Sequence, residues 1–469
     1  MSLADYENKP CQIPARDPMK TNPNLLQSCL LCAALMPAVV QAQFVCETND
    51  DTITLGGYFG HDSTVTVPSF VTTIDGLAFN DNNTLTSVII SDGITQVKDT
   101  AFSSCDNLTN VTIPNSLTNF DPGAFFDCPK LHSLIVGKFN PAYSSKDGVL
   151  FNKSQTTLIA CPKDKTSYFI PESVTTIGVE AFGECTGLVG LAIPDSVISI
   201  SHDAFLGCSS LASVTIGKGV TSIGNGAFFQ CFNLDGSIYI PSGVTNLDPN
   251  AFSNCRRLDK IIVDAHNPSY SSVDGVLFDK GQTTLLSCPE GKVGSYTIPA
   301  SVTNIGTSAF FNCVGLTEVA IDGNVINIGK GAFDNCTALQ AITVDALDSR
   351  YCSLDGVLFD KKQTTLLQFP AGKTGSYTIP DNVVSIGDDA FDDCTNLTEI
   401  TVPDSVVSIG KFAFNFCSNL KAIYFKGDAP QQAQHPFAGN VHLKTIYYSS
   451  GKTGWNAKFV GVPTQVWNP

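Results

Sequence analysis

Charged residues are scarce in this 469-residue sequence: Lys, Arg, Asp and Glu make up 15% of it, where about a quarter is usual. Bases are scarcer than acids, with 27 against 43, so the formal net charge is −16. An acidic surface repels nucleic-acid phosphates and anionic lipid headgroups. We therefore expect no nucleic-acid partner.

Methionine is also scarce, with 3 residues, and the body of the chain lacks Leu-rich helical stretches. Ser, Thr, Asn and Gly supply most of its polarity instead. This composition disfavours helices and favours β-structure with many turns.

A hydrophobic run long enough for a convincing transmembrane helix is missing. The apolar run at residues 25–40 is short, and Val40-Gln41-Ala42 behind it fits the small-residue rule of a signal-peptide cleavage site. We therefore expect residues 1–42 to be a signal peptide region, with Met19 as an alternative start and Gln43 as the new N-terminus. A lipid anchor at Cys29 is the alternative, although it would place the cysteine early in the run. The mature chain is predicted to be secreted or at the cell surface, without a transmembrane segment.

Recognisable catalytic and metal-binding motifs are missing as well. The six histidines share no spacing, and neither H-E-x-x-H nor G-x-S-x-G occurs. Residues 372–374 and 451–453 read Gly-Lys-Thr, but they lack the upstream glycine of a phosphate-binding loop. We predict no enzyme, no cofactor and no metal. Weak calcium binding stays open at the Asp-Gly pairs and at the acidic cluster of residues 388–393.

What the sequence does have is a repeat. A phenylalanine, usually preceded by alanine, recurs at steps of 23 residues, with one step of 24 and three of 57 or 58. A leucine lies six residues after each phenylalanine, and an apolar residue lies five before the first eleven. A fixed period of this length is typical of a leucine-rich solenoid. The phenylalanines are Phe79, Phe102, Phe125, Phe182, Phe205, Phe228, Phe252, Phe310, Phe333, Phe391, Phe414 and Phe437.

Spacing within one unit predicts its strands. Val111 and Ile113 alternate with polar residues, so they should point inward, and Pro114 should close the strand. A second short strand is expected at residues 117–120, and a single helical turn around the phenylalanine. One coil cannot bury its apolar side alone, whereas stacked coils can. The predicted fold is therefore a leucine-rich-repeat solenoid: β-rich stacked 23-residue coils with short helical turns.

The three long steps share a motif around Asp-Gly-Val-Leu-Phe, with two apolar runs separated by a polar turn. We expect each copy to be an inserted β-hairpin. The copies lie near residues 140–162, 267–289 and 348–370. The chain then divides into an N-terminal cap at 43–67, the solenoid at 68–426, and a decayed last coil with a C-terminal cap at 427–469, where Trp455 and Trp467 would cover the open end.

The pattern IPxSVTxIGxxAFxxCxxLxxVTI, with inserts reading YxSxDGVLF, resembles the BspA-like leucine-rich repeat family from about Val65 to Phe425. The resemblance implies a secreted or surface-attached protein, and some members are adhesins. The sequence departs from the common leucine-rich pattern in one respect. Its cysteine precedes the strand leucine by three residues instead of following the strand.

Ten of the 17 cysteines lie three residues after a repeat phenylalanine. In the first and last coils that position holds Asn82 and Asn440, which suggests a small side chain that hydrogen-bonds a turn backbone. We interpret the ten as a structural ladder of thiols, with scattered disulfides or metal binding as alternatives. They are Cys105, Cys128, Cys185, Cys208, Cys231, Cys255, Cys313, Cys336, Cys394 and Cys417.

The outward positions of the main strands form a Thr-rich, almost uncharged face. Tyr239, Tyr424 and Tyr447 stand out there as possible anchors, and with Ile262 and Thr343 they are our candidate partner-binding residues. The alternative is that the tyrosines pack against each other or the C-terminal cap. We expect a secreted or cell-surface binding and adhesion protein with an extracellular protein or glycan ligand. The alternative is a carbohydrate-binding or structural cell-envelope protein without a protein partner.

Overall fold

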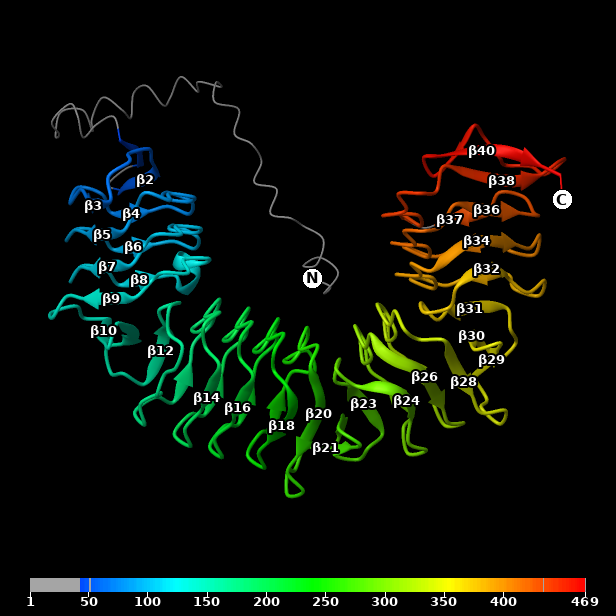
Figure 1. The fold of residues 1–469 in the computed structure, drawn as a ribbon, viewed down its shortest axis with the longest axis horizontal. Helices are drawn as coiled ribbons and strands as arrows, with labels where there is room; N and C mark the ends of the chain where they lie inside the picture. Colours follow the sequence, from blue (N-terminus) through cyan, green and yellow to red (C-terminus); the bar gives the residue numbers. More distant parts are fainter. Residues whose placement is uncertain (1–42, 50–51, 433, 469) are drawn as a thin grey trace. The chain divides into compact units, whose positions relative to one another are not determined.

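The computed structural model describes residues 43–49, 52–432 and 434–468, so the predicted signal peptide region lies outside the described residues. The chain divides into two compact units. One comprises the described residues up to Cys128 with Ile135–Ala142, and the other comprises Pro129–Leu134 with the described residues from Tyr143 onward. In each unit, short parallel strands repeat along the chain and pair with their counterparts in the next coil (Figure 1). The predicted solenoid fold is confirmed.

Each coil contributes a main strand, and inward and outward residues alternate along it. In β7, the buried Val111 and Ile113 alternate with the part-exposed Asn110 and Thr112, as the two-residue period of a strand requires. The main strands are β3 (Thr64–Val67), β5 (Ser87–Ile90), β7 (Asn110–Ile113), β9 (Ser133–Val136), β14 (Gly190–Ala192), β16 (Ser213–Thr215), β18 (Gly236–Ile240), β20 (Leu258–Val263), β24 (Val293–Thr297), β26 (Gly315–Ile321), β28 (Ala341–Val344), β32 (Gly375–Thr378), β34 (Leu397–Val402), β36 (Ala422–Phe425) and β38 (Thr445–Ser449).

A second series of strands, each two residues long, lies along another side of the coils. Each of these strands pairs in parallel with its counterpart in an adjacent coil. In most of these strands the second residue is the buried apolar residue five positions before the repeat phenylalanine. They are β4 (Thr73–Ile74), β6 (Gln96–Val97), β8 (Asn119–Phe120), β13 (Thr176–Ile177), β15 (Ser199–Ile200), β17 (Ser222–Ile223), β19 (Asn246–Leu247), β25 (Asn304–Ile305), β27 (Asn327–Ile328), β33 (Ser385–Ile386), β35 (Ser408–Ile409) and β37 (Gln431–Gln432).

Each insert forms three antiparallel strands. The sequence predicted a hairpin of two strands, and the structure adds a third strand before them. In the first insert, Asp147 and Gly148 have φ of 53° and 80°, the left-handed values of a tight hairpin turn. The last strand of each insert pairs in parallel with the next short strand. The insert strands are β10 (Tyr143–Lys146), β11 (Val149–Asn152), β12 (Thr157–Ala160), β21 (Tyr270–Val273), β22 (Val276–Asp279), β23 (Thr284–Ser287), β29 (Tyr351–Leu354), β30 (Val357–Asp360) and β31 (Thr365–Gln368).

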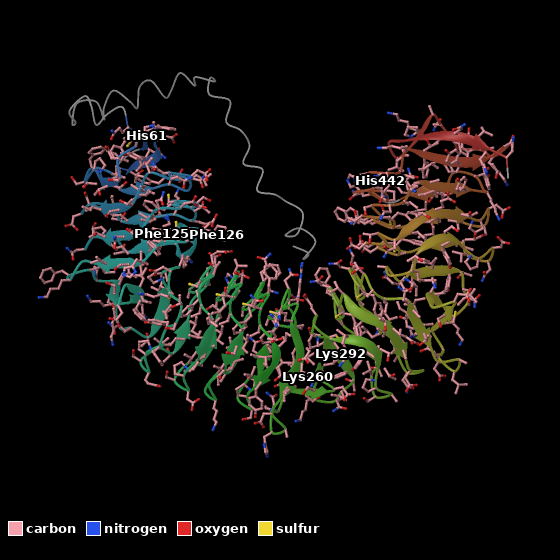
Figure 2. All side chains as sticks on the ribbon, in the orientation of Figure 1. His61, Phe125, Phe126, Lys260, Lys292 and His442 are labelled. Carbon is pink, nitrogen blue, oxygen red and sulfur yellow. The ribbon has the colours of Figure 1, made fainter. Side chains whose placement is uncertain are left out.

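The repeat phenylalanines form the core. Their rings stack from coil to coil, with centroids 4.9 Å apart between Phe205 and Phe228, and an insert interrupts the series three times. Phe125 belongs to this core, whereas its neighbour Phe126 is 40% exposed (Figure 2). Tyr58 of the N-terminal cap extends the series, because its ring lies 5.2 Å from that of Phe79.

The predicted helical turn around each phenylalanine is wrong for most coils. One coil has a 3₁₀ helix, η2 (Pro122–Phe125), and the others have tight turns. The reason is the backbone on either side of the phenylalanine: Glu180 and Glu184, two residues before and after Phe182, have left-handed φ of 52° and 56°. Left-handed residues interrupt a right-handed helix. Such residues flank the phenylalanine in most coils, whereas the coils of Phe125 and Phe252 have one only after it.

The ends of the chain carry extra strands. β1 (Phe44–Asn49) pairs antiparallel with β2 (Thr52–Tyr58), and β39 (Lys458–Phe459) pairs antiparallel with β40 (Val462–Trp467). Near the C-terminus, the Trp455 indole stacks on Tyr448 at 5.1 Å and donates a hydrogen bond to the Gly427 carbonyl at 3.1 Å. Aromatic side chains therefore cover the last coil of the second unit.

Candidate binding face

The outward side of the main strands in the second unit, which we call the outward face, carries all five candidate residues, and four of them form two adjacent pairs. Tyr239 of β18 pairs across the strands with Ile262 of β20, and the two side chains are 49% and 41% exposed. The Tyr239 hydroxyl donates a hydrogen bond to Asp264. This bond raises the pKa of Tyr239 and lowers the pKa of Asp264. The first pair is thus an exposed tyrosine held by a carboxylate.

Thr343 does not join either pair of aromatic or apolar residues. It lies on β28, in the separate sheet β24-β26-β28, and its hydroxyl is 3.5 Å from the Glu318 carboxylate. Thr343 is part-exposed, and it lies on a polar stretch of the outward face.

Tyr424 and Tyr447 form the second pair, and a tryptophan joins them. Their rings stack at 5.0 Å and 17°, and the Trp467 ring lies 4.9 Å from that of Tyr424 at 51°. We call these three residues the aromatic cluster. The tyrosines do pack against each other and against the C-terminal cap, yet all three side chains stay partly exposed. Burial raises the pKa of Tyr424.

Sequence reasoning assigned Trp467 to the cap and missed its place in the cluster. In β40, Gln465 lies opposite Tyr447 and Trp467 lies opposite Ser449, so both point to the outward face. Phe169 was missed too: it lies 23 residues before Ala192, an exposed residue of β14, and its own side chain is 91% exposed.

The ten ladder cysteines are buried and are free thiols in this structure. The thiol of Cys208 donates to the carbonyl of Phe182, in the preceding coil, at 3.0 Å, and Cys231 donates to Phe205 at 3.3 Å. Asn440 makes the same contact with its amide, at 2.7 Å from the Phe414 carbonyl. The cysteine position is therefore a donor position inside the stack.

Burial and the neighbouring thiols raise the pKa of Cys231 well above its ordinary value. Since the thiolate is the nucleophile and metal ligand, a raised pKa disfavours both kinds of chemistry. Among the residues that the structure describes, no three His, Cys, Asp or Glu side chains lie together as metal ligands would.

The acidic cluster forms part of a hollow of about 200 Å³ beside the third insert, lined by Lys330, Tyr351, Gln368, Asp388 and Asp389 among others. Asp389 pairs with Lys330 at 3.5 Å. Nearby, burial and the neighbouring carboxylates raise the pKa of Asp334 to about 7 and that of Asp392 to about 8. These acids hold protons near neutral pH, which makes them a pH-sensitive feature of the fold.

The chain matches the family described as BspA type leucine rich repeat region over residues 62–169, 160–272, 289–372 and 368–458. These matches span most of its length, so the chain belongs to this family of repeat proteins. No curated protein is similar enough to count as a match.

Solved structures of bacterial leucine-rich repeat proteins are similar to the chain. A leucine rich cell surface protein from Faecalibacterium prausnitzii is 29% identical, with 82% of this chain and 94% of that one covered and a TM-score of 0.47. A leucine-rich repeat protein from Bacteroides ovatus is 21% identical, with 91% and 98% covered and a TM-score of 0.36. The pneumococcal vaccine antigen PcpA is 16% identical, with 91% and 97% covered and a TM-score of 0.41.

Within the described part of the chain, we find no helix with the length and apolar character needed to cross a membrane.

Proposed function

We propose that this chain is a secreted or cell-surface binding protein that uses its solenoid as an interaction scaffold and has no catalytic role. The aromatic cluster carries the proposal. Three large rings stay partly exposed on a regular strand face, where a soluble protein usually keeps small or polar side chains. Tyrosine and tryptophan are also the residues that most often dominate binding energy at interfaces.

The surroundings of the cluster suit a docked partner. Thr401, Thr445 and Gln465 lie on the same side as the aromatic rings, and Glu399 is the charged residue closest to them in register. Apolar rings within a polar rim are the usual anatomy of a protein interface. An extracellular protein is therefore the partner that we favour.

A glycan is the second candidate ligand. Tyr424 and Tyr447 present two nearly parallel rings with hydroxyl and amide groups beside them. Flat rings favour the apolar side of a sugar ring, and the polar side chains can hydrogen-bond its hydroxyls.

A two-panel screen decides between these ligands. The purified chain is applied to a panel of extracellular matrix proteins and to a glycan array, beside a variant with Tyr424→Ala and Tyr447→Ala. Binding to a matrix protein that the variant loses supports the adhesin, and the same result on the glycan array supports the carbohydrate-binding alternative. If neither panel binds, or if the variant binds as well as the parent chain, the proposal fails.

A further inference from the structure

The residue that opens each insert occupies a recurring position in the repeat. In the first two inserts it is an asparagine, and its side-chain amide donates to two carbonyl groups of the preceding coil. Asn140 donates to Pro114 and Leu117 at 2.7 and 2.8 Å. Asn267 donates to Pro241 and Val244 at 3.0 and 2.8 Å. The partners lie 26 and 23 residues before the asparagine in both cases, so the position supplies two donors to two buried acceptors.

The third insert has Asp348 at this position, and a carboxylate cannot donate. Its Oδ1 accepts hydrogen bonds from the backbone N–H groups of Arg350 and Tyr351, both at 2.7 Å. Its Oδ2 has no partner, although the residue is only 1% exposed. A buried carboxylate oxygen without a donor or a cation is strongly disfavoured.

The same spacing identifies what faces that oxygen. The residues 26 and 23 positions before Asp348 are Asp322 and Val325, so by position their carbonyl groups correspond to those of Pro241 and Val244. The intervening turn lies against the insert, because a methyl group placed on Gly323 would be 3.4 Å from Asp348 N and 3.7 Å from Asp345 Oδ1. By analogy with the other inserts, the spacing implies that the Asp348 carboxylate meets two carbonyl oxygens where Asn140 and Asn267 bring an N–H₂ group.

Carbonyl and carboxylate oxygens are the ligands that Ca²⁺ prefers, and Ca²⁺ accepts irregular geometry with water completing its shell. The surrounding charge also suits a divalent cation, because Asp322 and Asp345 lie beside Asp348 in this corner of the fold. Backbone carbonyls supply two of the three ligands. The proposed site therefore does not need three acidic side chains as calcium ligands.

We propose that Asp348, together with the backbone carbonyls of Asp322 and Val325, binds a calcium ion that fastens the third insert to the coil before it. The ion takes the place of the amide of Asn140 and Asn267 in the other inserts. The third insert is then calcium-dependent, and the first two are not.

Asp348→Asn is the matched test, because it restores the side chain that the chain itself uses at the other two inserts. Calorimetric titration with CaCl₂ should find one binding site fewer in this variant than in the parent chain. In 1 mM CaCl₂ the parent chain should melt about 2 °C or more above its value in EGTA. The variant should melt at one temperature in both buffers, and in EGTA it should melt above the parent chain.

Equal melting of the parent chain in CaCl₂ and EGTA, with no titratable site, would overturn the proposal. A parent chain that ignores calcium, yet gains more stability on acidification than the Asp348→Asn variant does, would overturn it too, because a proton would then occupy the position. A second variant, Asn267→Asp, tests the premise. It leaves two carbonyls without donors, so it should melt below the parent chain in EGTA, and unchanged melting would refute the argument for both inserts.

Discussion

Cysteine serves in this chain as a small hydrogen-bond donor inside the stack. In seven of the ten ladder positions the thiol lies 3.0–3.3 Å from the carbonyl of the phenylalanine one coil earlier. Asn440 provides the same donor in the last coil. A buried backbone carbonyl needs a donor, and a thiol supplies a weak one in less space than an amide.

We predict that the ladder thiols are reduced and protected in the folded chain. Burial raises the pKa of Cys231, Cys336 and Cys394, so a thiol reagent meets neither exposed nor ionised sulfur. Titration at pH 8 should find few reactive thiols before denaturation and many after it, without a reductant. If denaturation released almost none, the ladder would be oxidised and this assignment would be wrong.

Cys352 provides the control, because it is the one cysteine among the described residues that is not buried. Its thiol lies 3.1 Å from the Asp360 carbonyl, and Ser144 and Ser271 make the same contact in the other inserts. Cys352→Ser should therefore remove one accessible thiol and leave the melting temperature unchanged.

The phenylalanines should differ in their contribution to stability according to their place in the stack. Phe228 is fully buried and has a stacked ring on each side, at 4.9 and 5.3 Å. Phe228→Ala should therefore lower the free energy of unfolding by about 3–5 kcal/mol. Phe437 is stacked on one side only, so Phe437→Ala should cost clearly less. Comparable losses in denaturant melts would show that Phe437 is not in a terminal coil.

The coil and its strands could be predicted from the sequence because their apolar columns recur at a fixed step. The turn around the phenylalanine could not, since its left-handed positions hold residues as different as Gln230, Asn254 and Phe416. A backbone conformation shared by unlike side chains leaves no pattern to read. The first strand of each insert was missed because Tyr143–Lys146 has no buried residue.

The candidate face was only partly predictable for a related reason. Outward positions follow from alternation, so Tyr239, Tyr424 and Tyr447 could be placed. Trp467 required the pairing of β40 with β38, which does not follow the 23-residue step. Contacts between outward side chains depend on the length and direction of each side chain, and the 23-residue repeat does not specify these.

The part-buried acid Asp392, in the turn around Phe391, should make stability depend on pH. Burial raises the pKa of Asp392 from 3.8 to about 8, so the folded chain keeps a proton that the unfolded chain releases. Stability should therefore fall as the pH rises from about 4 to about 8. Asp392→Asn stays uncharged and can still accept the amide of Asn415. It should gain on the order of 1–3 kcal/mol at pH 8 and nothing at pH 4 in urea melts, and an equal gain at both would contradict the raised pKa.

For the molecule as a whole, we propose that an acidic solenoid presents one exposed aromatic cluster to a partner. Few charges lie on the outward face, so binding there should depend only weakly on salt. Thr343 lies beside Glu318, so a charge added at this position is better tolerated as Thr343→Lys than as Thr343→Glu.

The measurement that tests the proposed function most directly is the dissociation constant for the partner found in the screen. We compare the parent chain with Tyr447→Ala, with Trp467→Ala, and with Phe139→Ala as a control, an exposed aromatic residue outside the main strands. The cluster variants should bind at least tenfold more weakly, and the control should bind like the parent chain, with all melting curves alike. Unchanged binding by both cluster variants, with binding lost when residues 152–155 in the turn of the first insert are replaced by glycines, would contradict the account and move the site to the inserts.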